Sequence, residues 1–241
     1  MLTKRFLQNR RGGQLSFAEH SRLEAAIADI NQVAPRDVIV KADQLLDHST
    51  LLLEGFMCRY IDDVKGLRQL VAIHVPGDFV DLHGYPLKRL DHNVASLTQA
   101  NTATIPHSAF DEISEELPNL SRKLWFATLL DAAIHRAWLF RLGRLDALGR
   151  VAHFLSETNV RLMAVDLSDG HQYACGITQY DLAEICGLTS VHVNRVMRQL
   201  REEQLCVFRS GVVEIPDPQR LARRGQFDPS YLYMTPNLFY A

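Results

Sequence analysis

The sequence predicts an α+β fold, in which a β-rich amino-terminal domain precedes one long helix and a helical carboxy-terminal domain. Three observations lead to this prediction. Residues 35–106 hold short β-branched runs between turn residues, residues 119–142 contain neither Pro nor Gly, and residues 177–215 combine two short helical patterns with a β-hairpin. We therefore expect a domain at 1–118, a helix and hinge at 119–144, and a second domain at 145–241.

Composition favours a folded chain and excludes several classes of protein. The 241 residues are 47% hydrophobic and 22% charged, which excludes disordered and collagen-like chains. Lys and Arg number 26 against 28 Asp and Glu, so any nucleic-acid binding must come from a local basic patch. No apolar run approaches the roughly 20 residues of a membrane span, and the amino terminus lacks the apolar core of a signal peptide. We expect a cytoplasmic protein that does not bind membranes.

The amino-terminal domain is predicted to begin with a helix at 19–30, where apolar residues recur at helical spacing. Strands are predicted at 37–42, 50–61, 69–75, 93–98 and 102–105. Residues 62–66 supply the hairpin turn between the second and third strands, because Asp and Gly tolerate the positive φ of such turns. This succession favours a sandwich or a small barrel.

The periodicity becomes helical from residue 108, first in a short element that ends before Pro118 and then in a long helix at 119–142. The long helix has a first apolar stripe, formed by Leu120, Leu124, Ala127, Ile134, Trp138 and Arg141. A second stripe is formed by Phe126, Leu130, Ala133, Ala137 and Phe140. About 24 residues make some 36 Å of helix, longer than a small domain needs, so we expect one stripe to face the β domain and the other a second copy. Gly143, or the stretch to Gly149, is the expected hinge into a helix at 145–159.

Residues 177–215 have the pattern of a helix-turn-helix followed by a wing. Thr178 and Asp181 have the spacing of a helix-start capping box, and Gly187 ends that short helix. Thr189 can cap a second helix, whose buried face is predicted at i, i+3, i+4 and i+7: Val193, Val196, Met197 and Leu200. The segment 205–215 is then predicted to form a β-hairpin around a Ser-Gly turn.

The opposite face of the second helix has the chemistry of a DNA-reading surface. One arc gathers Ser190, Val191, Asn194, Arg195, Arg198 and Arg201, with His192 near its edge. Arg can donate a bidentate pair to guanine, Asn can pair with adenine, and Val can contact a thymine methyl group. Thr189 and Ser190 lie at the helix amino terminus, where hydroxyls and free backbone amides bind phosphate. The alternative is an ordinary amphipathic helix pair with a solvated polar face, but the wing and the preceding elements favour DNA binding.

From about residue 35 to 215 the chain resembles the Crp/Fnr family of transcriptional regulators. The most specific stretches are ITQYDLAEICGLTSVHVNRVMRQLREEQL (177–205) and HVPGDFVDL (74–82). The resemblance implies a jelly-roll-like β-roll related to cyclic-nucleotide-binding domains, a dimerisation helix and a winged helix-turn-helix domain. It implies a homodimer that binds a palindromic site on double-stranded DNA, with RNA polymerase as a further partner and no enzymatic activity.

The resemblance also assigns roles to individual residues. Arg195 falls on the position where the family reads guanine, and Asn194 on a further specificity position. Ser190, Val191 and His192 fall on the other base and phosphate contacts. The start of the first helix, where members contact the DNA backbone, holds Thr178, Gln179 and Tyr180. Many members have Glu in place of Val191, so we expect a different half-site.

The effector is not identified by the sequence. Gly77 and Asp78 occupy the place of a Gly-Glu pair that contacts cyclic AMP in some members, and mark a candidate effector pocket. The Arg-Ser pair that completes such a site is missing from LKRLDHNVASLT (87–98), so cyclic AMP is disfavoured, since its phosphate needs a placed cation. Oxygen-sensing members ligate an iron–sulfur cluster through amino-terminal cysteines, and this chain has none before Cys58.

Two rival hypotheses concern the β domain. It could be a cupin-like metal-binding enzyme, with His74, His83 and His92 near the metal and the carboxy-terminal domain used for assembly, although no HxH pair is present. It could also have lost its pocket and control DNA binding with no ligand. Cysteine spacings match no zinc site, so we expect no metal site and buried thiols at Cys58, Cys175, Cys186 and Cys206. The Pro-rich and aromatic tail at 216–241 is expected to pack back onto its own domain; a surface for polymerase or for the β domain is the alternative.

Overall fold

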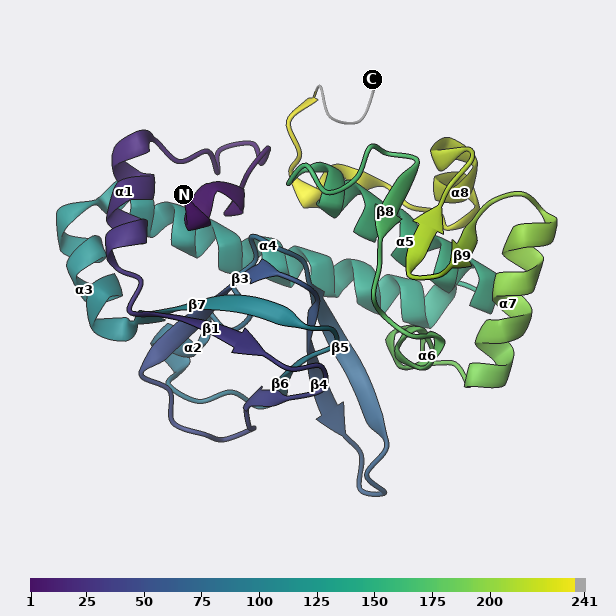
Figure 1. Ribbon diagram of the computed structural model, residues 1–241, viewed down its shortest axis with the longest axis horizontal. Coiled ribbons are helices and arrows are strands. Elements are labelled where there is room, and N and C mark those ends of the chain that lie inside the picture. Colours follow the sequence, from purple (N-terminus) through teal and green to yellow (C-terminus); the bar gives the residue numbers. More distant parts are fainter. Residues whose placement is uncertain (237–241) are drawn as a thin grey trace.

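Strands fill the first half of the chain and helices most of the second, so the predicted α+β class is confirmed. The computed structural model describes residues 1–236. Figure 1 shows the β sheets on one side, a helical domain on the other, and the long helix α4 running behind both. Among residues 1–236 no helix combines the length and apolarity needed to cross a lipid bilayer.

The β domain consists of two antiparallel sheets with the strand orders β1-β7-β3 and β2-β6-β4-β5. The strands are β1 (Asp29–Val33), β2 (Val38–Val40), β3 (His48–Glu54), β4 (Met57–Asp62), β5 (Arg68–His74), β6 (Asn93–Ser96) and β7 (Ala100–Pro106). Apolar side chains from both sheets form the core, including Leu51, Leu52, Met57, Leu70 and Ile105. The turn predicted at 62–66 joins β4 to β5.

The structure corrects one predicted strand and adds one that was not predicted. The run 50–61 is not one strand, because Gly55 turns the chain with φ +89° and β3 and β4 enter different sheets. A Cβ at Gly55 would lie 2.3 Å from the carbonyl oxygen of Gln99, so only glycine fits there. The third strand of the wing sheet, β8 (Gln172–Ala174), was not predicted.

The helix predicted at 19–30 is shorter and starts earlier. Helix α1 (Phe17–Ala25) follows the short 3₁₀ turn η1 (Leu2–Arg5) and begins at a capping box made by Ser16 and Glu19. The prediction was wrong for Ile30, which lies in β1 opposite Ala103 of β7. Pairing with β7 outweighs the helical spacing of the apolar side chains in this segment.

The helices after the β domain follow the predicted order. They are α3 (His107–Glu116), α4 (Pro118–Arg144) and α5 (Ala147–Met163), while the short α2 (Gly84–Leu87) within the β domain was not predicted. Gly143 lies inside α4 and Gly149 inside α5, so the chain turns at Leu145 and Asp146 between them. Asp146 caps α5 by accepting a hydrogen bond from the backbone of Gly149.

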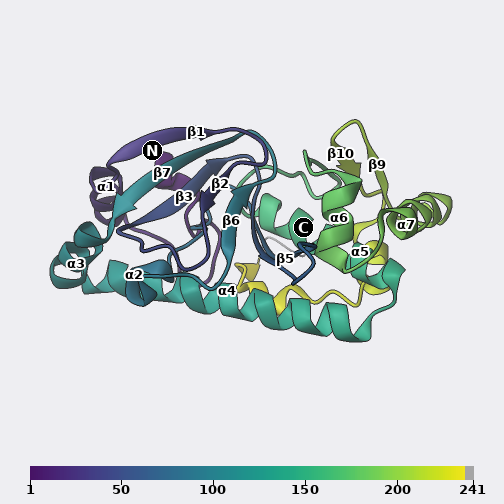
Figure 2. The same cartoon turned by 90° about the horizontal axis from the view of Figure 1, so that it is seen from below.

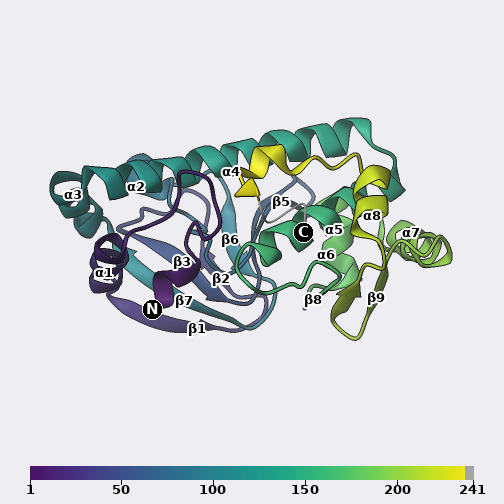
Figure 3. The ribbon, with the colours of Figure 1, turned by 90° about the horizontal axis from the view of Figure 1, so that it is seen from above.

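Helix α4 buries one face against its own chain and exposes another. The buried side chains come from both predicted stripes: Leu120, Leu124, Leu130, Ala133, Ile134, Trp138 and Arg141. The expectation that one whole stripe stays free for a second copy is therefore wrong: of the second stripe only Phe140 is exposed, and Phe126 packs edge-to-face against Tyr233. The exposed apolar side chains are Trp125, Leu129, Leu139 and Phe140. Figure 3 shows that one side of α4 forms an outer edge of the molecule.

The carboxy-terminal domain packs three helices and a small sheet around α5. Its further elements are β8, α6 (Gln179–Cys186), α7 (Ser190–Glu202), β9 (Val207–Arg209), β10 (Val212–Glu214), α8 (Pro218–Arg224) and the 3₁₀ turn η2 (Pro229–Leu232). The small sheet has the order β8-β10-β9. In Figure 2, α6, α7 and the β9–β10 hairpin lie together at one end of the molecule.

The tail packs onto its own domain and also reaches the amino-terminal segment. Phe227 and Tyr231 contact the ring of His153 in α5. Further on, the backbone of Arg11 donates to the carbonyl of Tyr233 at 2.7 Å, and the backbone of Thr235 donates to Asn9 at 3.0 Å. The segments near the two chain ends are thus joined across the domain boundary. The last residues of the predicted Pro-rich and aromatic tail, 237–241 with Phe239 and Tyr240, lie outside the described residues.

Candidate nucleic-acid interface

The first helix of the helix-turn-helix, α6, begins and ends where its local sequence predicts. The Thr178 hydroxyl accepts from the backbone of Asp181 at 3.2 Å, and the Asp181 carboxylate accepts from the backbone of Thr178 at 2.7 Å, so the capping box is confirmed. Gly187 ends the helix with φ +61°, in the left-handed region that glycine adopts without strain. Gln179 and Tyr180 are exposed on the first turn, and the Tyr180 side chain is 59% exposed.

The second helix, α7, is anchored by the predicted apolar face. The Thr189 hydroxyl accepts from the backbone of His192 at 3.2 Å and caps the helix. All four predicted core residues are buried: Val193, Val196, Met197 and Leu200. They pack α7 against α5 and α6, so the orientation of its outer face is fixed by the domain core.

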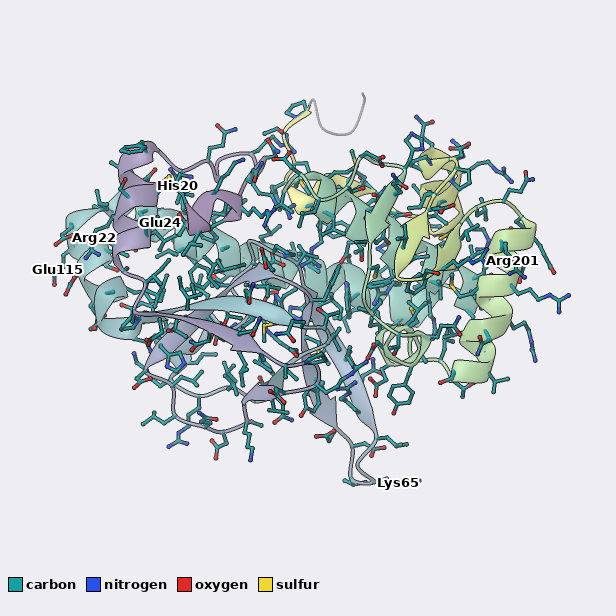
Figure 4. All side chains as sticks on the ribbon, viewed as in Figure 1. His20, Arg22, Glu24, Lys65, Glu115 and Arg201 are labelled. Carbon is teal, nitrogen blue, oxygen red and sulfur yellow. The ribbon has the colours of Figure 1, made fainter. Side chains whose placement is uncertain are left out.

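The outer face of α7 brings together the side chains predicted to read DNA. Those that are exposed are Val191, His192, Asn194, Arg195, Arg198 and Arg201, and Ser190 is half-buried. Figure 4 shows Arg201 on α7 pointing away from the body of the molecule. Within residues 1–236, Arg195 has no hydrogen-bond or ion-pair partner, whereas Arg198 donates to Glu202 at 2.8 Å. Asn194 donates one amide hydrogen to the carbonyl of Ser190 at 3.0 Å, which leaves its second amide hydrogen and its side-chain oxygen without a partner among residues 1–236.

The predicted hairpin at 205–215 is present as β9 and β10, beside α7. Ser210 and Gly211 form its turn with φ +52° and +75°. Sequence reasoning did not single out Arg209, an exposed cation at the end of β9 next to this turn. Its one sequence signal is its charge, since an exposed Arg can donate hydrogen bonds to the phosphate oxygens of a nucleic acid.

Gly77 and Asp78 line a small, highly charged cavity of about 50 Å³. Asp78 is already engaged, because its carboxylate accepts from Arg161 at 2.6 Å and from the backbone of Val75 at 2.9 Å. Gly77 has φ +98°, and a Cβ there would lie 2.5 Å from the carbonyl oxygen of Arg5. Such a cavity has room for a few waters, whereas organic ligands usually occupy pockets of about 300 Å³ or more. In this conformation the cavity does not hold a nucleotide.

The three histidines of the metalloenzyme hypothesis do not form a metal site. The rings of His83 and His92 are 5.3 Å apart, centroid to centroid, and His74 is buried separately. In the described part of the chain, no three His, Cys, Asp or Glu side chains are arranged to hold a metal ion. The four cysteines are buried and free, as expected, and burial raises the pKa of Cys58 to about 12.

Comparison with known proteins identifies relatives of this chain. The profile of the Crp-like helix-turn-helix domain matches residues 149–224. The transcriptional activatory protein AadR of Rhodopseudomonas palustris is 24% identical over 208 residues, covering 86% of this chain and 85% of AadR. The nitrogen fixation regulation protein FixK of Bradyrhizobium diazoefficiens is 27% identical over 172 residues, 70% of each chain.

Solved structures show the same fold. FixK2 from Bradyrhizobium japonicum superposes with a TM-score of 0.73 at 23% identity and covers 82% of this chain and 96% of its own. A CRP-family transcriptional regulator from Thermus thermophilus superposes with a TM-score of 0.63 at 18% identity, covering 81% and 96%. The likeness therefore extends over both domains and the helix between them.

Proposed function

Since this chain is a Crp/Fnr-type transcriptional regulator with a Crp-like helix-turn-helix domain, we propose that it acts in the cytoplasm as a homodimer that reads a palindromic DNA site through α7. The observation that carries the proposal is the outer face of α7. Arg195 is exposed without a protein partner in the described chain, on a helix whose other face is locked into the core. Bidentate recognition of a base requires a guanidinium with free donors on a helix that is held firmly by its buried face.

The proposed DNA surface extends from α7 to its neighbours. Base contacts are assigned to Val191, Asn194 and Arg195, and phosphate or flanking contacts to Thr178, Gln179, Tyr180, Thr189, Ser190, His192 and Arg198. The hydroxyl of Thr178 is used in its capping box, so its contact to DNA would come from the helix terminus. Arg209 on the wing adds a further phosphate contact.

The homodimer is supported by the exposed apolar side chains of α4. Trp125, Leu129 and Leu139 are 66%, 54% and 72% exposed, and lie at i, i+4 and i+14. This spacing fits a heptad seam and places the three side chains along one side of the helix. Two copies related by a two-fold axis through this seam present two α7 helices to two half-sites about one helical turn apart.

The family regulates transcription and is not enzymatic, so the metalloenzyme hypothesis is abandoned. AadR is named as an activator, which supports RNA polymerase as a further partner of the proposed dimer. Gly77 and Asp78 remain the proposed effector region, for a ligand other than cyclic AMP or an iron–sulfur cluster. A ligand that binds there would either break the ion pair between Asp78 and Arg161 or bind beside the intact pair.

The test is selection of bound DNA from a random-sequence pool by the purified protein, at a stated salt concentration, with and without cyclic nucleotides. We expect an enriched palindrome without nucleotide. If a DNA sequence is enriched only when a cyclic nucleotide is present, the result contradicts the proposal that DNA binding does not require a cyclic nucleotide. Absence of any enriched sequence in both arms would contradict sequence-specific binding by α7.

A further inference from the structure

Helix α6 contributes to the proposed DNA surface but carries no positive charge of its own. Its sequence, QYDLAEIC, contains Asp181 and Glu184 and neither Lys nor Arg. The amino-terminal end of this helix is where we place the DNA backbone. A phosphate that approaches it meets the field of two carboxylates within one helical turn, which opposes binding.

Two arginines of the β domain supply the opposite charge. Arg36, in the loop before β2, donates to both carboxylate oxygens of Asp181, one of them at 2.8 Å. Arg68, at the start of β5, donates to Glu184 from Nε at 3.0 Å and from Nη2 at 2.6 Å, and lies 3.6 Å from Asp181. Both carboxylates are covered by these contacts, with the Asp181 side chain 0% exposed and that of Glu184 8% exposed.

The arginines are held in place by the β domain. The backbone of Arg36 has φ +75° and donates to the carbonyl of Ser96 at 3.1 Å. The guanidinium of Arg68 lies over the ring of Tyr60, 5.2 Å from its centroid. Burial alone would raise the pKa of Asp181, but hydrogen bonds from Arg36 and Thr178 outweigh burial and hold this pKa below its ordinary value. The carboxylate therefore stays charged and depends on its counter-charge.

We propose that Arg36 and Arg68 are positioning residues that make DNA affinity depend on docking of the β domain, by neutralising Asp181 and Glu184 beside the phosphate-contacting end of α6. The inference rests on the proposed function. While the β domain is docked, the arginines neutralise Asp181 and Glu184, so these carboxylates do not repel the DNA phosphates. When the domains separate, the two carboxylates are uncovered and repel the phosphate backbone. A signal that moves the β domain thus changes DNA affinity through charge, with no change in α7.

The experiment compares four proteins on the DNA selected by the wild type, using fluorescence anisotropy at low and high salt. The double variant Arg36→Gln with Arg68→Gln removes the counter-charges. A rescue variant adds Asp181→Asn and Glu184→Gln to that pair. The matched control is Arg22→Gln, which breaks the pairs of Arg22 with Glu112 and Glu116, within the amino-terminal half and away from α6. Thermal unfolding checks that each variant is folded.

We expect the double variant to bind about tenfold more weakly at low salt, with a smaller loss at high salt because salt screens the exposed carboxylates. The rescue variant should recover most of the lost affinity, and Arg22→Gln should bind like the wild type. Unchanged affinity in a folded double variant would overturn the inference. A loss without rescue would also overturn it, since the arginines would then contact DNA directly or merely orient the domain. Failure of the proposed function is seen separately, as the lack of any selected DNA for the wild type.

Discussion

The hydroxyl of Tyr231 donates a 2.6 Å hydrogen bond to Oε2 of Glu157, joining the carboxy-terminal segment to the fully buried centre of α5. The other oxygen of Glu157 accepts from Nε1 of Trp138 in α4 and from Arg161. Burial alone would raise the pKa of Glu157, but the nearby Arg161 and Arg141 guanidinium groups and these donors lower it, so the carboxylate is charged and needs its donors.

We expect Tyr231→Phe to lower the free energy of unfolding by about 1 to 3 kcal/mol, because it leaves a buried carboxylate oxygen without a donor. Chemical denaturation measures this change. Tyr233→Phe is the matched control, since the Tyr233 side chain is 43% exposed and contacts Phe126 through its ring. Equal stability of both variants would show that the tail is not held through Glu157.

The β domain should lose stability on mild acidification because of His83. Burial, and then the positive charge of Arg59, lower the pKa of His83 from 6.5 to about 3. The unfolded chain therefore takes up a proton as the pH falls below about 6.5 while the folded chain does not, so stability is complete above that pH and declines toward pH 3. We expect His83→Gln to remove about 1 kcal/mol of the decline between pH 7 and pH 5.5.

The measurement is urea denaturation as a function of pH for the wild type and the variant. Val191→Gln, which changes no titratable group at an exposed position of α7, is the control and should follow the wild-type curve. A pH profile for His83→Gln that runs parallel to the wild type would contradict the assignment.

The features that the sequence predicted correctly depend on residues that lie close together along the chain. The capping box of Thr178 and Asp181 spans three residues, and the buried face of α7 follows from helical spacing alone. Contacts that join distant segments left no local signal. Arg36 and Asp181 are 145 residues apart, and nothing around Arg36 distinguishes it from a solvated surface arginine. Ile30 was misassigned for the same reason, since its strand exists through pairing with β7.

The same limit applies to the long helix. Spacing predicted two apolar stripes on α4, one for the β domain and one for a second copy. Residues of both stripes are buried, and the exposed side chains of Trp125, Leu129 and Leu139 belong to neither stripe. Phe126, in the second stripe, contacts Tyr233, a residue more than one hundred positions later, and no local pattern indicates this contact. The exposed face of α4 can therefore be identified only from the folded structure of the whole chain.

Charging the exposed seam of α4 should separate the proposed dimer. Leu129 is 54% exposed, so Leu129→Asp should leave the fold of one chain intact. In a dimer the same side chain would be buried against its symmetry mate, where two carboxylates would repel, and we expect dimer affinity to fall roughly hundredfold or more. Sedimentation velocity measures the change. Leu87→Asp, at an exposed position in α2, is the control. A protein that is monomeric before substitution would contradict the homodimer.

Arg195 and Arg198 lie one turn apart on α7 but should affect DNA binding differently. Arg195 has no protein partner in the described chain and can turn both donors toward a base, whereas Arg198 is bonded to Glu202 at 2.8 Å. We expect Arg195→Ala to cost about 1 to 3 kcal/mol on the selected site and to relax preference at one base pair. Arg198→Ala should weaken binding to all sequences alike. It should also reduce the slope of log affinity against log salt concentration by roughly the value of one phosphate contact or less, because Glu202 already offsets the charge of Arg198.

Binding of each variant to a panel of sites with single base-pair changes separates these two roles. For Arg195→Ala, the site with a changed guanine should bind as well as the selected site, since the side chain that told them apart is gone. An equal loss on selected and random DNA would instead make Arg195 a phosphate contact. Base recognition would then be assigned to Val191 and Asn194 alone, the other base contacts proposed on the exposed face of α7.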